Sequence, residues 1–287
     1  MSKKSLIKLS VIIVSYRNLG VLRNCLDSIQ KFNDIGNALE VIVVEQSPRD
    51  NIYQSLLSDY QWVKVVKNEN RGFGAGNNRG AKEARGEYLL FINPDTVLVE
   101  PIFGFAVEKF EHDSQMGLFG VQLVDALGRR NRSFHFRKPW GLWRIAAWRL
   151  CDQINLFLPH AMYTAGADMF IRASAFQEAG GFDERMFMYY EETYLCNQLN
   201  KHGMKIAYFP QKKIVHLEGR SSANVQVFKR QLDSLTYLCE ESGCNYIKVL
   251  KHLEKDRKMK RLLGLHRQED SDEINEIEMR LCQRCGN

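Results

Sequence analysis

The stretch that most constrains the fold covers residues 88–96 and reads Tyr-Leu-Leu-Phe-Ile-Asn-Pro-Asp-Thr. Its five leading apolar or aromatic residues are typical of a strand buried on both faces of a mainly parallel sheet. Proline has no backbone N–H and cannot continue a central strand, so we expect the chain to leave the sheet at Asn93-Pro94-Asp95. The Asp95 carboxylate would then lie at the carboxyl edge of the sheet, where open α/β folds bind ligands. A plain strand-ending turn would use the same residue types.

Strands and helices alternate through the first half of the chain. Apolar runs predict strands at residues 9–14, 41–44, 63–66 and 88–92, and a helix is expected after each of the first three. The first helix shows the apolar spacing of a face packed on a sheet, at Leu22, Cys25, Leu26 and Ile29. This alternation predicts a doubly wound α/β fold. We expect the polar residues that follow three of these strands to meet at one edge of the sheet, namely 15–18, 45–47 and 93–95.

The pattern loosens after Asp95. Helices are expected at residues 101–112 and from 191 to about 202, and strands at 116–124, 169–172, 205–209 and 214–216. Residues 128–139 are polar and basic, which predicts a loop. Because no internal repeat or low-complexity linker interrupts the chain, we expect one compact unit over residues 1–222 and a helical C-terminal extension over residues 223–287.

Length and composition narrow the class of protein. A chain of 287 residues can bury one large core or two moderate ones. No apolar run approaches the roughly 18 residues needed to span a bilayer, and the run at residues 11–14 is too short for a signal peptide. We therefore expect a cytoplasmic protein whose seven cysteines are reduced. Cys282 and Cys285 form only half of a zinc or redox motif.

Basic residues concentrate in two stretches, 129–149 and 248–261, within a net charge of +6. No nucleic-acid-binding motif accompanies them, so no nucleic-acid partner is expected. Residues 140–150 mix tryptophans and aliphatics with arginines, which is typical either of an amphipathic helix packed on the core or of a helix at a membrane surface. Residues 248–261 would be a second contact of such a peripheral membrane protein. The amphipathic C-terminal segment would suit a homodimer equally.

Two acids and a histidine later in the chain are candidates for chemistry. Glu191 and Glu192 begin a predicted helix, where adjacent carboxylates often only stabilise the first turn. The aromatic and Met-rich residues 186–190 before them favour burial instead, which would raise the pKa of a carboxyl and suit a general base. His216 follows a strand; paired with a carboxylate at the sheet edge, it would suit a Mg²⁺ or Mn²⁺ site.

Taken in order, these motifs resemble family 2 glycosyltransferases with the GT-A fold, and in particular their bacterial rhamnosyltransferase-like branch. The resemblance covers about residues 9–222 and does not extend into the C-terminal 65 residues. The motifs that carry it are Val-Ile-Ile-Val-Ser-Tyr near the start, Val-Val-Glu-Gln-Ser, Asn-Arg-Gly-Phe-Gly-Ala-Gly-Asn-Asn, Phe-Ile-Asn-Pro-Asp-Thr, Gly-Gly-Phe-Asp-Glu, Tyr-Glu-Glu and Val-His.

The resemblance implies a GT-A fold, a Rossmann-like doubly wound mixed sheet, with a nucleotide-sugar-binding half at about residues 1–125 and an acceptor-binding half at about 126–222. It also implies an inverting transfer of a sugar from a UDP- or dTDP-linked donor to a saccharide or lipid-linked saccharide in cell-surface polysaccharide assembly. Asp95 and His216 would bind Mn²⁺ or Mg²⁺, and Asn93 stands where the family's metal motif has its first Asp. Glu192 would be the base that deprotonates the acceptor, with Glu191 beside it.

The resemblance also implies a set of donor-binding residues: Ser15, Tyr16, Glu45, Gly74, Asn77, Asn93, Asp95, Ala167 and Asp168. The chain departs from the family pattern at Arg17, usually Asn; at Glu45-Gln46, usually Asp-Asn; at Glu192, usually Asp; and at Tyr194, often an acid. Because of these departures, a non-catalytic glycosyltransferase-like binding protein is an alternative interpretation. A third reading is a dinucleotide-binding oxidoreductase, because Gly72-x-Gly-x-Gly76 precedes Asp95 by about 20 residues.

Overall fold

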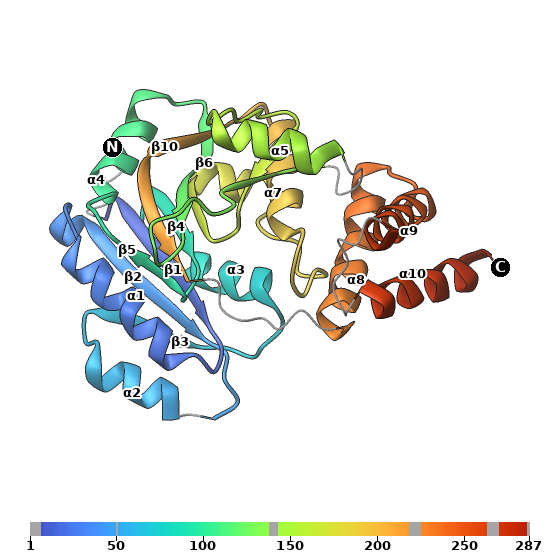
Figure 1. Cartoon of the computed structure of the whole chain (residues 1–287). Coiled ribbons are helices and arrows are strands. Elements are labelled where there is room, and N and C mark those ends of the chain that lie inside the picture. The colour runs from blue at the N-terminus through green and yellow to red at the C-terminus, as the bar shows by residue number, and fades with distance from the viewer. Residues whose placement is uncertain (1–6, 50, 138–142, 218–224, 263–269, 286–287) are drawn as a thin grey trace.

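The computed structural model describes residues 7–49, 51–137, 143–217, 225–262 and 270–285. Its centre is an eight-stranded mixed sheet in the order β3-β2-β1-β4-β9-β6-β10-β5 (Figure 1). Strands β1 to β4 are parallel, and β9 runs antiparallel to both of its neighbours, β4 and β6. The bounds are β1 (Leu9–Ser15), β2 (Leu39–Glu45), β3 (Val63–Lys67), β4 (Tyr88–Ile92), β5 (Thr96–Leu98), β6 (Met116–Val124), β9 (Asp168–Arg172) and β10 (Lys205–His216).

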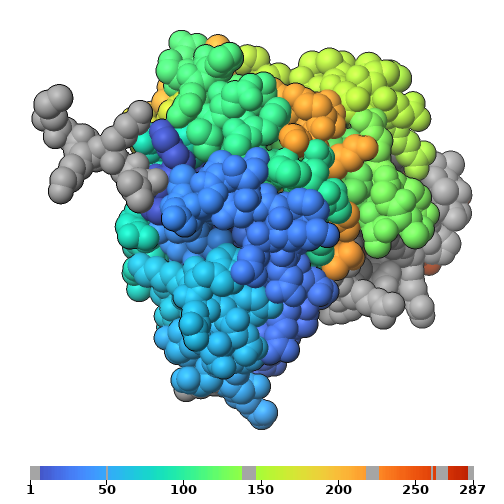
Figure 2. All heavy atoms as spheres, turned by 90° about the vertical axis from the view of Figure 1, so that its left-hand side faces the viewer, coloured from blue at the N-terminus to red at the C-terminus, as the bar shows by residue number. Residues whose placement is uncertain are grey.

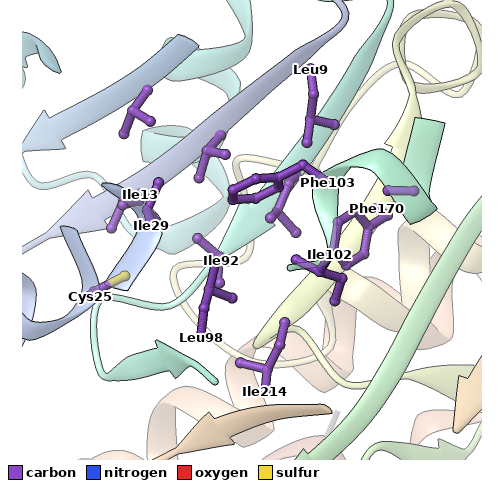
Figure 3. Packing of buried hydrophobic residues seen from close by; sticks show 14 of the residues in the cluster. Leu9, Ile13, Cys25, Ile29, Ile92, Leu98, Ile102, Phe103, Phe170 and Ile214 are labelled. Atoms are coloured by element: carbon purple, nitrogen blue, oxygen red, sulfur yellow. The ribbon is translucent and has the colours of Figure 1, made fainter. Parts of the chain in front are cut away.

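Helices cover both faces of this sheet, as the alternation predicts. On β1, Val11 and Ile13 pack with α1 and α4, whereas Ile12 packs with α6 and α7 and Val14 lies on the side of α3. Figure 3 shows the first of these cores, and Figure 2 shows the face that α1, α2 and α4 form. These helices are α1 (Leu19–Lys31), α2 (Asn51–Asp59), α3 (Phe73–Glu83), α4 (Phe103–His112), α6 (Ala173–Glu178) and α7 (Glu191–Lys201).

The turn after β4 has the structure that its sequence predicts. The strand ends at Ile92, and the backbone N–H of Asn93 donates to the carbonyl of Ala167 at 3.1 Å. The hydroxyl of Thr96 donates to the carbonyl of Asn93 at 2.7 Å, which closes the turn around Asp95. Because β2, β1 and β4 are adjacent and parallel, their three polar ends lie at the same edge of the sheet, as expected.

Some expected elements differ from the structure. Residues 205–216 form one strand rather than two, because β10 continues past Pro210 with a register shift between Phe209 and Lys213. The predicted loop at 128–139 contains strand β7 (Phe134–Phe136), which pairs with β8 (Met162–Thr164) in a separate small sheet. The short elements β5, β8 and α6 are absent from the expected set, because three to six residues carry too little periodicity to be recognised.

Helix α5 (Trp143–Gln153) uses Trp148 inside the fold. The indole N–H of Trp148 donates to the carbonyl of Phe134 at 2.8 Å, and the ring packs in a small cluster with Phe134. At Trp148, therefore, the structure agrees with the reading of a helix packed on the core. Residues 138–142, including Trp140, and the side chains of residues 143–146 lie outside the described part of the chain.

The C-terminal region is helical, as expected, and gathers on one side of the molecule beside α7 (Figure 1). It comprises α8 (Val225–Ser242), α9 (Tyr246–Leu262) and α10 (Asp270–Cys285). Met186 is fully buried among residues of these helices, and the hydroxyl of Ser234 donates to the carbonyl of Met188 at 2.8 Å. The extension therefore packs against the segment that leads into α7. Within the described residues, no helix combines the length and apolarity that crossing a membrane requires.

Candidate active site

Asp95 and His216 face each other at the carboxyl edge of the sheet. The Nε2 atom of His216 lies 3.3 Å from Oδ1 of Asp95, and the two side chains are 18% and 16% exposed. Antiparallel pairing of β5 with β10 places His216 opposite Thr96, and the N–H of Leu217 donates to the carbonyl of Asp95 at 2.9 Å. The backbone thus holds together two candidate ligands that are far apart in the sequence.

This pair fits a divalent metal that shares its coordination with a substrate. No group of three or more His, Cys, Asp or Glu residues in the described part of the chain could hold a metal ion. Mg²⁺ sites in phosphate-binding enzymes commonly use one or two protein ligands and complete the coordination with phosphate oxygens and water. A carboxylate oxygen and an imidazole nitrogen fit this pattern, and the imidazole favours Mn²⁺.

A groove of about 520 Å³ lies next to the ends of β1 and β2, and Tyr16, Gln46, Ser47 and Asn70 are among the residues that line it. Ser15 is buried, and its hydroxyl donates to Oδ1 of Asn18 at 3.0 Å rather than into the groove.

Glu45 is fully buried beside this groove, next to Ser15 in the register of the sheet. Its Oε1 accepts from the N–H of Ser47 at 2.7 Å, and its Oε2 is buried with no hydrogen-bond partner among the described residues. An unpaired buried carboxylate oxygen is unfavourable unless a donor reaches it. The hydroxyl or N–H of a bound nucleoside would provide such a donor.

Arg17 has a left-handed backbone conformation, with φ of 56°. Asn adopts this region more readily than most residues, so the structure gives a physical reason for the Asn that the family usually has at this position. Here the guanidinium lies 5.0 Å from the centre of the Tyr16 ring, and the N–H of Arg17 donates to the hydroxyl of Ser47 at 2.8 Å.

The glycines of residues 70–78 allow close packing within the protein. Gly72 has φ of 110°, and a Cβ there would lie 2.4 Å from the carbonyl oxygen of Phe187. A Cβ on Gly74 would lie 3.0 Å from Cβ of Phe182. Asn77 is buried, and its amide donates to the carbonyl of Phe73 at 3.2 Å. The structure therefore explains Gly74 and Asn77 by packing, and their predicted contact with the donor stays a prediction.

Asn78 is a residue whose role sequence reasoning missed. Its Nδ2 donates to the carbonyl of Phe182 at 2.8 Å and to Oε1 of Glu184 at 3.1 Å, while its Oδ1 accepts from the N–H of Phe182 at 2.9 Å. Gly181, with φ of 73°, permits this approach, because a Cβ there would lie 2.8 Å from Oδ1 of Asn78. Asn78 thus ties the glycine-rich turn to the segment that leads into α7. The signal available in the sequence was the occurrence of both motifs in one family pattern.

We expect Asn78→Ala to lower the free energy of unfolding by about 2–3 kcal/mol, because it leaves the Phe182 backbone groups unpaired. Turnover should fall more than donor affinity, because Asn78 holds the segment that leads into Glu191 and Glu192. Denaturant unfolding and steady-state kinetics measure both effects. Arg79→Ala is the matched control, since it removes only a surface pair with Glu83 and should cost less than about 1 kcal/mol. Equal losses in the two variants would contradict this role of Asn78.

Glu191 and Glu192 begin α7 after two strained residues. Tyr189 and Tyr190 are both left-handed, with φ of 73° and 66°, which is uncommon and unfavourable for non-glycine residues. Burial raises the pKa of Glu191 well above its usual range, and the neighbouring Glu192 raises it further. Burial raises the pKa of Glu192 to about 7. The direction of both pKa shifts agrees with the burial that residues 186–190 predict, and the role of a general base stays a prediction.

Contacts through residues 166–168 connect the acid pair to the sheet edge. A Cβ on Gly166 would lie 3.8 Å from the carboxyl carbon of Glu192, and the next residue, Ala167, accepts the hydrogen bond from Asn93. Each glutamate has a buried Oε2 with no hydrogen-bond partner among the described residues. The structure thus brings Glu192 close to the turn that carries Asp95.

Asp168 lies at this junction but points into the protein. It pairs with Ile92 across β9 and β4, is fully buried, and accepts the N–H of Val121 through Oδ2 at 2.7 Å. Burial raises the pKa of Asp168 well above its usual range. Both Ala167 and Asp168 have buried side chains, so neither is exposed to a donor in this structure. Their direct contact with the donor stays a prediction.

Comparison with known families identifies this arrangement. The family model described as "Glycosyl transferase family 2" matches residues 10–177, which is more than half of the chain and extends from β1 to β9. The chain belongs to glycosyltransferase family 2. The match covers the groove beside β1 and β2, Asp95 and residues 166–168, whereas the acid pair and His216 follow it in the sequence.

Bacterial relatives place this family 2 chain near rhamnosyltransferases. It is 26% identical over 223 residues to the O-antigen biosynthesis protein RfbC of Myxococcus xanthus, which covers 75% of this chain and 18% of RfbC. It is 22% identical over 224 residues to the rhamnosyltransferase WbbL of Escherichia coli, covering 72% and 82% of the two chains. Over 60 residues it is 38% identical to the N-acetylglucosaminyl-diphospho-decaprenol L-rhamnosyltransferase of Mycobacterium tuberculosis, covering 21% and 20%.

Solved structures agree with the predicted GT-A fold. A mannosyltransferase of Pyrobaculum calidifontis, in complex with GDP-Man and Mn²⁺, has a TM-score of 0.58 at 16% identity, over 79% of this chain and 61% of that one. GalNAc-T7 with UDP, GalNAc and Mn²⁺ has a TM-score of 0.60 at 16% identity, over 76% and 46%. The prediction of a dinucleotide-binding oxidoreductase is therefore wrong. Gly72, Gly74 and Gly76 lie close to other residues of the chain, where a Cβ would contact Phe187, Phe182 and Val14, respectively.

Proposed function

We propose that this chain is an inverting glycosyltransferase that moves a sugar from a UDP- or dTDP-linked donor to a hydroxyl of a saccharide or lipid-linked saccharide. The observation that carries the proposal is the contact path from Glu192 through Gly166 and Ala167 to the turn holding Asp95. In this proposal Glu192 is the base, and residues 166 and 167 lie between it and the turn that carries the candidate metal ligand Asp95. The names of RfbC and the decaprenol rhamnosyltransferase support a role in cell-surface polysaccharide assembly.

In this proposal Asp95 and His216 hold Mn²⁺ or Mg²⁺. When bound, the ion offsets the negative charge that develops on the diphosphate leaving group. Tyr16 lies against the base of the nucleotide, and the unpaired Oε2 of Glu45 accepts a hydrogen bond from the nucleoside. Glu45 is one methylene longer than the usual Asp of the family, which favours a donor seated slightly farther from β2.

Glu192 acts as the general base. Its carboxylate takes the proton from the acceptor hydroxyl, and the resulting oxygen attacks the anomeric carbon on the face opposite the diphosphate. The new glycosidic bond forms as the bond between the anomeric carbon and the diphosphate oxygen breaks, which inverts the configuration at the anomeric carbon. Two adjacent buried carboxyls do not both ionise readily, so Glu191 keeps its proton while Glu192 is charged.

Contact with the cytoplasmic face of the membrane through residues 140–150 and 248–261 belongs to the same proposal. Basic residues near anionic lipid contribute about 1 kcal/mol each. Residues 248–261 lie within α9, which carries seven Lys or Arg residues at 248, 251, 255, 257, 258, 260 and 261, of which Arg257 and Lys258 are paired with glutamates. A homodimer through the C-terminal helices would use the same region.

A nucleotide-sugar screen tests the proposal. We expect one UDP- or dTDP-sugar to raise the melting temperature and to be hydrolysed slowly in the presence of Mn²⁺ but not of EDTA. NAD(H) serves as the control ligand and should have no effect. Stabilisation without any hydrolysis or transfer would support the non-catalytic alternative, and hydrolysis that survives EDTA would contradict the metal-dependent mechanism.

A further inference from the structure

The segment that leads into the acid pair has a strained backbone. We call residues 185–190 the approach segment, and in the structure they belong to no helix or strand. Its last two residues, Tyr189 and Tyr190, are both left-handed, and Tyr190 directly precedes Glu191, the first residue of α7. Residues other than glycine keep this conformation only where surrounding contacts hold it. The placement of Glu192 therefore depends on what holds the approach segment.

One face of α8 contacts the approach segment. Four residues of α8 share this face, because they are spaced by four, three and four positions: Arg230, Ser234, Tyr237 and Glu241. The guanidinium of Arg230 lies 4.6 Å from the centre of the Phe187 ring. Glu241 pairs with Arg185 at 3.0 Å, and the Arg185 guanidinium lies 5.2 Å from the centre of the Tyr237 ring. Three of the four side chains thus contact side chains of the approach segment.

Ser234, the fourth residue of this face, contacts the backbone of the approach segment. Its hydroxyl donates to the carbonyl of Met188 at 2.8 Å, and Ser234 is 1% exposed. Met188 directly precedes the two left-handed tyrosines. A buried hydrogen bond meets little competition from water, whereas an exposed ion pair such as that of Arg185 with Glu241 contributes little. Ser234 is therefore the residue of this face that is best placed to fix the backbone before the turn.

The opposite face of α8 is anchored in the C-terminal core. Phe228, Leu232, Leu235 and Cys239 lie on that face, buried in one cluster with residues of α9 and α10. The hydroxyl of Tyr246, at the start of α9, donates to the carbonyl of Leu232 at 3.2 Å. Because closely packed interiors deform little, α8 is a rigid support for whatever its other face contacts.

The glycine-rich turn also contacts the approach segment. The N–H of Phe73 donates to the carbonyl of Phe187, at 2.9 Å. Phe187 is thus held by a turn that lies within the family match over residues 10–177 and by Arg230 of α8, which lies outside it. Two parts of the chain hold the approach segment, and one of them carries no family motif.

We propose that α8 is a positioning element of the active site, in which Ser234 fixes the turn that places Glu192. This inference rests on the proposed function, in which Glu192 is the base, and it gives the C-terminal helices a part in that function. Ser234 is not among the described residues that line the groove beside β1 and β2. Its loss should therefore act on proton transfer rather than on donor binding.

Ser234→Ala in the full chain tests the proposal with two readouts. Amide hydrogen exchange over residues 185–192 should become faster by about fivefold or more, because the turn loses the hydroxyl that holds the Met188 carbonyl. The kcat of sugar transfer should fall by about tenfold or more, because a misplaced catalytic group loses rate steeply. The KM for the donor should change by less than about twofold, since no donor contact is removed.

Thr236→Ala is the matched control. The hydroxyl of Thr236 donates to the carbonyl of Leu232 at 3.1 Å, within α8 itself, and not to the approach segment. Both substitutions replace a hydroxyl residue of the same helix by alanine, which favours the helix, so neither weakens α8. Unchanged exchange in Ser234→Ala, or the same increase in Thr236→Ala, would overturn the proposal. Faster exchange in Ser234→Ala with an unchanged kcat would overturn it as well.

A double variant tests whether Ser234 acts through Glu192. In a Glu192→Gln background, Ser234→Ala should lower kcat further by less than about twofold, because the base that it positions is already gone. A further tenfold loss would show that Ser234 acts by another route and would overturn the proposal. Faster exchange in Ser234→Ala, in a chain whose wild type transfers no sugar, would count against the proposed function instead.

Discussion

Glu192→Gln should lower turnover by about 10²–10⁴-fold while leaving the affinity for the nucleotide nearly unchanged, because it removes a general base and nothing that touches the donor. Glutamine keeps the size of the side chain and its packing against Gly166. Donor hydrolysis and transfer rates measure turnover, and titration with UDP measures nucleotide affinity. A parallel loss of UDP binding would show that the substitution disturbs the site rather than the proton transfer.

The pH dependence gives a second readout of the same substitution. A base works only when deprotonated, so kcat/KM of the wild type should fall as the pH drops through about 7, the pKa to which burial raises Glu192. Stability should show the opposite trend. The folded state holds a proton that the unfolded state releases above its ordinary pKa of 4.5, so stability should decline from pH 4.5 to about 7. Glu192→Gln should remove the part of the pH dependence of kcat/KM, and of stability, that comes from the Glu192 carboxyl.

Glu191→Gln is the control for these measurements. Glu191 is already protonated in the proposed mechanism, because burial and the charge of Glu192 both raise its pKa. Replacing it should therefore retain turnover within about tenfold, since no proton transfer is lost. If Glu191→Gln is inactive and Glu192→Gln is not, the base is Glu191.

The sequence was sufficient where local patterns decide the structure. Proline at position 94 and the apolar run before it predicted both the end of β4 and the edge that holds Asp95. Aromatic residues before Glu191 predicted a buried carboxyl, since burial is a property of the immediate neighbours along the chain. The meeting of three polar strand ends followed from the parallel order of β2, β1 and β4.

Contacts that link distant segments were beyond prediction from local patterns. The pairing of Asn78 with Phe182 joins residues 104 positions apart, and nothing in either motif specifies the other as its partner. The left-handed Tyr189 and Tyr190 were missed for a related reason. Tyrosine rarely adopts this conformation alone, so the surrounding contacts, including that of Ser234 with Met188, must stabilise it. The C-terminal helices thus contact the residues that lead into the acid pair although they carry no family motif.

Asp95→Asn should weaken Mn²⁺-dependent binding of the nucleotide by about 10²-fold or more, because a metal stabilises charge on the diphosphate by several kcal/mol. Asparagine keeps an oxygen at nearly the same position but removes the negative charge that faces His216. Calorimetric titration of UDP with and without Mn²⁺ separates the metal-dependent part of the affinity from the part that does not depend on the metal. The loss should be confined to the titration with metal.

Asp113→Asn is the matched control. Asp113 pairs with Lys205 at the amino-terminal ends of β6 and β10, whereas Asp95 follows the carboxyl end of β4 at the opposite edge of the sheet. His216→Gln separates the two ligands further. Gln lacks the imidazole nitrogen that favours Mn²⁺, so this variant should lose more affinity with Mn²⁺ than with Mg²⁺, whereas Asp95→Asn should lose affinity with both. A site in which the two variants behave identically with both metals would mean that His216 orients Asp95 and does not itself bind the ion.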